Sequence, residues 1–558
     1  MSADTLPARP ATSRGLSRLL TLALVALVGA VLVNALFEGW VQALLGSTSR
    51  GNFGRVVLHE VAWPKAVKNG LFLALGAGAV LKVAVDRRWR DFTTGADVAL
   101  VVLGVVLVTA GLVNGSSPSL IAEAGYVYLR GAIVFYALRA AAPAWSTIRP
   151  VMLVMGGLVV LNTVVALAQM IGGPAVYETF GWVDMTWANT ARSQGMLNHP
   201  NHLGHVLALS IIGLLLWARA RERMGRRAWI AVGLLALALS ASQSRESIIA
   251  LCVTVGLLWL LRGIAFRRMA IVAALIVAFT GAQIVLRPDN QAEWQKRLNG
   301  VAAALRFPTG DEGHRTESPA PAVAPSAAPS VTPSPARSVA PSRKPTGKPS
   351  GKPSGKPSGK PSGKPSGKPS ATGSSKPSAV SPSPSPAPST TYVPPREIRV
   401  LYFLQSVRLI ESKPVLGYGV GQFGGIVAEK NNPDWHLNPA FGPEGFDRHG
   451  FAAKQVDSFW LHLIVEAGVL GILSYLAWMV LIGQPLLRRT ERFRGDRKPG
   501  GPYVYWGLAA LVFGFQVAFL SASLEDPILP ALMFAIVALG WLFPDRGAIA
   551  AEPEATLP

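Results

Sequence analysis

The chain has 558 residues, of which 50% are hydrophobic and 15% are charged, and its mean hydropathy is positive. This composition excludes an ordinary soluble globular protein and is typical of a polytopic membrane protein. The formal net charge of +22 does not indicate a nucleic-acid partner, because the excess lies in one Lys-rich stretch and in short loops between apolar runs, where it reports membrane topology.

Twelve apolar runs follow one another along the chain, most of them about 17 to 22 residues long and therefore able to cross a hydrocarbon core of ~30 Å as helices. They lie near residues 19–37, 67–85, 95–113, 121–142, 150–171, 203–217, 228–243, 246–262, 269–286, 459–482, 503–521 and 528–543. No small-residue cleavage pattern follows the first run, so we interpret it as an uncleaved span. The sequence predicts an all-α polytopic membrane protein of about twelve helices, divided into 1–286, an extracytoplasmic loop at 287–457, 458–545 and a cytoplasmic tail at 546–558.

The basic residues of the short loops set the predicted orientation, because Lys and Arg are retained on the cytoplasmic side. Arginines occur after the second, fourth, sixth, eighth and tenth runs, whereas the alternate loops are nearly bare apart from Arg50, Arg55 and Lys65 in the first of them. The sequence therefore predicts a multi-pass protein of the cytoplasmic membrane with both termini inside and the large loop outside.

A low-complexity insert fills the first part of the large loop. Residues 316–395 hold eight Lys and two Arg against one Glu, and residues 347–370 are six perfect Gly-Lys-Pro-Ser repeats. Such a sequence has little to bury, so it is predicted to be a disordered, extended tether. Two interpretations stay open: the lysines contact an anionic wall or capsule polymer, or the insert is an expansion without a role.

The second part of the loop, 397–457, is predicted to be ordered. Apolar residues recur with helical spacing over 397–412, which predicts an amphipathic helix lying on the outer membrane face. Pro414 and the glycines at 417, 419 and 421 end that helix.

Three polar features fall on the predicted outer face. They are the run from Arg192 to Asn201, the Ser244-Arg245-Glu246 start of the eighth helix, and Arg399 with Asp457. A guanidinium at a bilayer edge can hold phosphate oxygens with two parallel hydrogen bonds. The alternative is that these arginines only reach toward lipid headgroups from helix ends.

These residues resemble a known family. Gly195-x-x-x-His-Pro-Asn201, Ser244-Arg245, Arg399-x-x-x-Phe403 followed by Glu411-x-x-Pro-x-x-Gly417-x-Gly419, and Asp457-Ser followed by Glu466-x-Gly468 are similar to motifs of the O-antigen ligase and polysaccharide polymerase superfamily of bacterial membrane proteins. The resemblance covers about 169–482, and the helix count and single large loop agree with it.

The resemblance implies a metal-independent, inverting glycosyl transfer from a polyprenyl-diphosphate-linked glycan to a sugar hydroxyl, without a cofactor. Arg245 and Arg399 correspond to the arginines that clamp the donor diphosphate. Asp457-Ser458 stands where a ligase has His-Asn, and Phe403 replaces a Trp, which makes a polymerase or another glycan transferase as attractive as a ligase. Asp457 is then the candidate general base, although it also suits an N-cap.

Eight further residues are expected to contact the substrates, and three histidines are not expected to bind a metal. The expected contacts are Arg192, Asn198, His199, Asn201, Arg130, Glu411, Gly417 and Gly419. His199, His202 and His205 have no carboxylate at ligand spacing, and Pro200 interrupts their turn, so we predict no metal site.

Two other functions compete with glycan transfer. Twelve helices are common in transporters of solutes or lipids, but the chain shows no internal repeat with broken helices in matching halves. A purely structural wall anchor would not need the ordered part of the loop. The lipid bilayer, the lipid-linked donor and a saccharide acceptor are the predicted partners.

Overall fold

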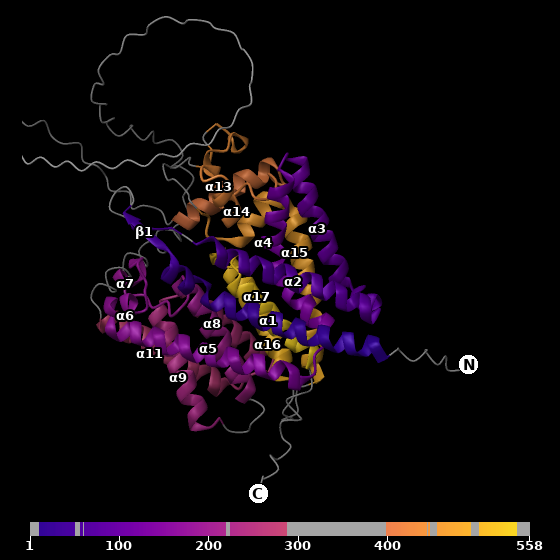
Figure 1. Ribbon diagram of the computed structural model, residues 1–558. Helices are drawn as coiled ribbons and strands as arrows, with labels where there is room; N and C mark the ends of the chain where they lie inside the picture. Colours follow the sequence, from indigo (N-terminus) through magenta and orange to yellow (C-terminus); the bar gives the residue numbers. More distant parts are fainter. Residues whose placement is uncertain are drawn as a thin grey trace, which may run out of the picture. The chain divides into compact units, whose positions relative to one another are not determined.

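The computed structural model describes residues 11–50, 56–59, 61–218, 224–286, 398–443, 445–446, 455–492 and 501–543 (Figure 1). All of these residues belong to one compact unit. The predicted tether at 316–395 lies outside the described residues.

The first elements are α1 (Ala11–Leu45), β1 (Ser47–Arg50), β2 (Val56–His59), α2 (Ala62–Asp86), η2 (Trp89–Phe92), α3 (Gly95–Val113), α4 (Pro118–Ala141), α5 (Trp145–Gly172), α6 (Pro174–Thr179) and α7 (Thr186–Asn189). They are followed by α8 (Pro200–Trp217), α9 (Arg226–Ser242), α10 (Arg245–Leu260), α11 (Phe266–Leu286), α13 (Ile398–Ser412), α14 (Ile426–Asn431), η5 (Trp435–Leu437), η6 (Pro439–Phe441), α15 (Phe459–Arg492), α16 (Pro502–Leu520) and α17 (Ile528–Leu542).

Within the described ranges, nine helices are long and apolar enough to cross a membrane: α1, α2, α3, α4, α5, α8, α11, α15 and α16. Helices α9, α10 and α17 occupy the other three predicted ranges but have only 17, 16 and 15 residues. The chain is therefore a helical multi-pass membrane protein, as predicted. The count of twelve spans and the orientation stay predictions.

A short hairpin departs from the predicted all-α architecture. Strands β1 and β2 pair antiparallel, with Ser47 opposite His59 and Arg50 opposite Val56. At four residues each, the strands are too short to give a recognisable alternation of apolar and polar residues.

Local sequence explains where helices begin and how closely they pack. Helix α3 starts with a capping box between Thr94 and Asp97, which satisfies two free backbone amides. Helix α4 crosses α17 at Gly131, where a Cβ atom would lie 2.4 Å from the ring of Phe534. A glycine at this position lets the two helices approach, as small residues do between membrane helices.

Helix α15 is broken at Gly468, whose φ of 66° lies in the left-handed region. The broken turn is completed by the stretch that follows α13: Val469 donates its amide to the carbonyl of Pro414 at 2.8 Å, and Tyr418 donates to Val465 at 2.9 Å. Non-helical backbone at membrane depth is tolerated only where such partners satisfy it. Gly417 is required because a Cβ there would meet the Val465 carbonyl at 2.3 Å.

We call residues 398–443 with 445–446 the α13–α14 segment, and Glu466 of α15 is its main polar anchor. The Glu466 carboxylate, 2% exposed, accepts hydrogen bonds from the amides of Gly421 (2.9 Å) and Phe423 (2.8 Å) and from the hydroxyl of Tyr128 (2.8 Å). The Phe423 ring lies 5.2 Å from Trp435 in an edge contact, at the centre of a buried aromatic cluster. The segment thus has a core of its own and is fixed to α15 and α4.

Candidate functional site

The turn that leads into α8 is held by two amide side chains of α5. The side-chain oxygen of Gln169 accepts hydrogen bonds from the backbone amides of Gln194 (3.0 Å) and Gly195 (2.8 Å). Its side-chain nitrogen donates a hydrogen bond to the Gly195 carbonyl at 2.9 Å. Asn162 accepts the amide of Met196 at 2.9 Å. Gly195 has a φ of 63°, which a residue with a Cβ rarely adopts. These bonds fix the loop that carries Arg192 and the first turn of α8.

The first turn of α8 is polar and tightly bonded. His199 caps the helix by accepting the amide of Asn201 on Nδ1 at 3.0 Å, and its ring contacts that of Trp187. Burial, and then the positive charges of His202 and Arg192, hold the pKa of His199 well below its usual range. This imidazole is therefore neutral at neutral pH and carries its proton on Nε2.

Arg192 ties this turn to the junction between α9 and α10. Its Nη2 donates to Asn201 Oδ1 at 2.7 Å, its Nε donates to the carbonyl of Ser242 at 3.1 Å, and its guanidinium lies over Trp187. The predicted contacts Arg192, His199 and Asn201 are thus neighbours in the structure. Because the Arg192 guanidinium already donates hydrogen bonds to both Ser242 and Asn201, its first role is to position Asn201.

Two histidines of α8 are paired with carboxylates that are distant in the sequence. His202 contacts Asn198 Oδ1 through Nδ1 and Asp526 Oδ2 through Nε2, both at 2.8 Å. His205, fully buried, contacts Glu246 at 3.0 Å. Burial alone would raise the pKa of Asp526, but the charges of His202 and Arg130 outweigh it and the pKa is lowered. Arg130, 5% exposed, therefore lies within electrostatic reach of this pair.

The start of α10 packs directly on α8. The hydroxyl groups of Ser244 and Ser247 are 2.7 Å apart, and both lie against Gly204, where an added Cβ would meet them at less than 3.0 Å. Arg245 follows Ser244 as the first residue of α10 and is half-buried. The two predicted motifs, one before α8 and one before α10, therefore meet at the same end of the helices, which we call the site end.

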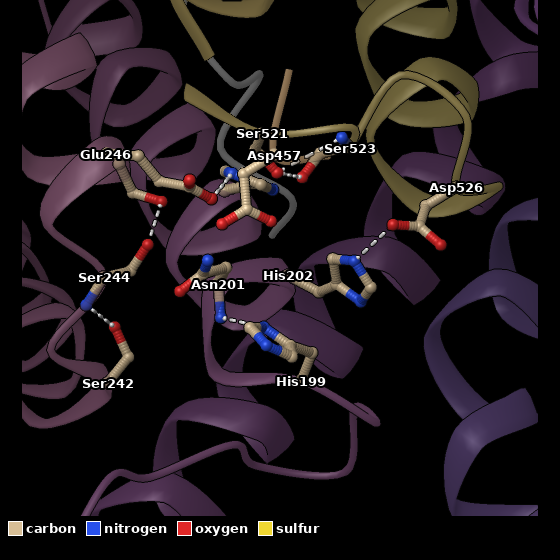
Figure 2. Close-up of polar contacts among 12 residues, drawn as sticks. His199, Asn201, His202, Ser242, Ser244, Glu246, Asp457, Ser521, Ser523 and Asp526 are labelled. Carbon is tan, nitrogen blue, oxygen red and sulfur yellow. Dashed lines mark hydrogen bonds and ion pairs between the residues drawn. The ribbon is translucent and has the colours of Figure 1, made fainter. Parts of the chain in front are cut away.

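Arg399 and Asp457 form an ion pair at the site end. Nε and Nη2 of Arg399 both contact Asp457 Oδ2, at 3.3 and 3.2 Å, and the two side chains are 37% and 47% exposed. Within the described residues the second oxygen of Asp457 has no hydrogen-bond partner. Figure 2 shows this carboxyl group directed toward the side on which Asn201 and Ser244 lie. Burial and the negative charge of Asp457 raise the pKa of the neighbouring Tyr402 to about 12.

Three predicted substrate contacts are placed elsewhere. Glu411 is exposed and lies twelve residues after Arg399 on α13, which is about 18 Å along a helix. Gly417 and Gly419 are buried, and a Cβ on either would meet protein atoms within 3.0 Å, in α15 for Gly417 and around Asn114 for Gly419. The structure gives these glycines a role in docking the α13–α14 segment, and substrate contact by the three residues stays a prediction.

Several residues that complete the site end were not predicted from the sequence. Glu246 and Asp526 were not expected to pair with histidines, and Ser521 and Ser523, whose hydroxyl groups are 2.5 Å apart, line the loop between α16 and α17 beside Asp526 (Figure 2). Only the position of Asp526 between two apolar runs gave a sequence signal. Within the described part of the chain, no group of three His, Cys, Asp or Glu side chains could hold a metal ion.

Comparison with known proteins finds a match to the PT disordered repeat family model over residues 337–379. These residues belong to the Lys-rich insert and lie outside the described residues. No curated protein matches the chain.

Proposed function

We propose that the chain is a membrane glycan transferase of the O-antigen ligase and polysaccharide polymerase type. It transfers a glycan from a polyprenyl diphosphate to the hydroxyl group of an acceptor sugar at the outer face of the cytoplasmic membrane. The observation that carries the proposal is that Asp457, ion-paired with Arg399 and like it only partly buried, lies beside the polar starts of α8 and α10 at one end of the apolar helices (Figure 2).

The placement of the arginines supports a lipid-linked, anionic donor. Arg245 begins α10, Arg399 lies in the first turn of α13, and both are only partly buried. A lipid diphosphate places its charge at this depth, between the hydrocarbon core and water, and the guanidinium fork matches phosphate oxygens. Arg130 adds positive charge within electrostatic reach of Asp526.

The chemistry follows from these positions. In the transfer, the acceptor oxygen bonds to the anomeric carbon as the bond from that carbon to the diphosphate oxygen breaks. The second oxygen of Asp457 accepts the hydroxyl proton, and Arg399 holds the carboxylate by its other oxygen. Arg245 and Arg399 stabilise the charge that develops on the departing diphosphate, and electrostatic stabilisation of this kind often lowers the barrier more than any other effect.

The test measures glycan transfer from a purified lipid-linked donor by three variants. Ser458 caps α15 by accepting the amide of Leu461 at 3.4 Å, so the N-cap expectation for Asp457 is wrong. Asp457→Asn keeps the shape of the side chain but should lower the rate about 100-fold or more, the usual scale for general base catalysis. Arg245→Lys and Arg399→Lys keep the charge but lose the planar fork, so both should lose donor binding or turnover.

Arg488→Lys, in the part of α15 farthest from the site end and exposed, is the matched control and should retain full activity. An active Asp457→Asn protein would remove the base. Full activity of both arginine variants would remove the diphosphate clamp, and failure of the wild-type protein to transfer any polyprenyl-linked glycan would reject the function.

A further inference from the structure

A large apolar cavity of about 720 Å³ lies among α1, α4, α5, α8, α9, α16 and α17. Its walls are almost entirely Leu, Val, Met, Ile and aromatic side chains, and the few polar contributors include Ser210 and Thr163. A volume of this size is typical of sites for small molecules. Because the walls offer so few hydrogen-bonding groups, the body of its ligand must be hydrocarbon.

The cavity reaches the end of the helices remote from the site end, and along α5 its lining extends from Trp145 to Leu167. Pro502, Tyr503 and Trp506 come from the first turns of α16, and Ala231 and Leu234 come from the first half of α9. Both helices end at the site end, so they begin at the opposite one. Along α8 the lining runs from Val206 to Trp217, which is about 17 Å and close to half of a ~30 Å hydrocarbon core.

A cation marks the end of the cavity that lies opposite the site end. Arg149, in the first two turns of α5, lines the cavity and is exposed, and no residue of the described ranges forms an ion pair or hydrogen bond with it. Arg227 lies four residues before Ala231 on α9, and residues with this spacing share a helix face. Trp145 and Tyr503, whose rings are 5.4 Å apart, line the same end, and such aromatic rings favour the headgroup level.

We propose that this cavity binds an anionic phospholipid from the leaflet opposite the site end. The acyl chains fill the apolar part, and the phosphate group lies at Arg149 with Arg227 close by. Basic residues at the mouth of a cavity between membrane helices are the arrangement that recognises anionic headgroups. The polyprenyl donor proposed above is a poorer occupant, because its diphosphate belongs at the other end of the helices. The lipid site itself rests on the cavity and its basic end; only the exclusion of the polyprenyl donor rests on the proposed function.

Two adjacent glycines of α5 provide a matched test of the cavity. Gly156 lines the cavity and Gly157 does not, and a Cβ added to either would meet no atom within 4 Å. Gly156→Leu therefore fills the cavity without a clash at Cβ, while Gly157→Leu makes the same change in helix propensity outside it. Arg149→Gln removes the cation, and Arg488→Gln removes a cation from the same end of the molecule but away from the cavity.

The experiment measures lipid binding to delipidated full-length protein by native mass spectrometry, with phosphatidylglycerol and phosphatidylcholine as probes. We expect the wild-type protein and Gly157→Leu to bind phosphatidylglycerol more tightly than phosphatidylcholine. Gly156→Leu should weaken phosphatidylglycerol binding at least about tenfold, the loss expected when two or three methylene groups are no longer buried. Arg149→Gln should weaken it about fivefold and leave phosphatidylcholine unchanged, and Arg488→Gln should change neither.

Three results would overturn the proposal. Equal binding by the two leucine variants would show that the lipid binds elsewhere. Equal binding of the two phospholipids by the wild-type protein would exclude recognition of the headgroup charge. Displacement of phosphatidylglycerol by an added polyprenyl diphosphate would assign the cavity to the donor chain instead.

Discussion

Glu466 is predicted to hold the α13–α14 segment on the helices, and two substitutions should weaken this attachment by different amounts. Its two oxygens accept three hydrogen bonds from buried donors. A buried donor left unpaired costs about 1–3 kcal/mol. Glu466→Ala leaves all three without an acceptor, which amounts to about 3–9 kcal/mol, whereas Glu466→Gln keeps one acceptor oxygen and loses about one bond, or about 1–3 kcal/mol.

Amide hydrogen exchange measures this difference directly, because the Gly421 and Phe423 amides are two of the donors. Each 1.4 kcal/mol corresponds to a factor of about ten in the opening equilibrium. Protection of the peptide around these amides should fall about five- to 150-fold in Glu466→Gln and more than about 150-fold in Glu466→Ala. Glu429→Ala, an exposed glutamate of α14, is the control. Unchanged protection in Glu466→Ala, or equal loss in the two variants, would refute the reasoning.

Three further predictions concern topology, the insert and pH. Tags at either terminus should report the cytoplasm, and amine reagents should label Lys348 to Lys368 from outside intact cells; protection of these lysines would reverse the orientation. Excision of residues 347–370 should leave protein level and glycan transfer largely unchanged, because the sequence predicts a disordered insert and such inserts make few contacts; lost activity at a normal protein level would give the repeats a role. The lowered pKa of Asp526 means that this group stabilises the fold above its unfolded value of about 3.9 and loses that contribution as pH falls through the lower folded value. Thermal unfolding measured from about pH 5 down to about pH 2 should therefore be less acid-sensitive in Asp526→Asn, and identical acid sensitivity would contradict this.

The helices could be predicted because each is an apolar run with few charges. The hairpin could not, since strands such as Ser47–Arg50 are polar and carry no periodic signal. For the site, alternation of helix direction was enough to place the Arg192 loop, Ser244 and the Arg399 region at one end of the molecule.

Hydrogen bonds between side chains that are distant in the sequence could not be predicted. His202 and Asp526 are separated by 324 positions, and no spacing rule connects them. The partners of Glu466 could not be predicted for a different reason: two of the three are backbone amides, which every residue except proline possesses. Only the fold decides which amides a carboxylate meets.

The break in α15 at Gly468 also sets an order of assembly. The groups that complete the broken turn come from Pro414 to Tyr418, which are synthesised before α15. This stretch must therefore dock as α15 enters the membrane, because a spanning helix with an open turn would expose unsatisfied backbone groups to lipid. Insertion of α15 and docking of the preceding segment are thus one event in the biogenesis of the protein.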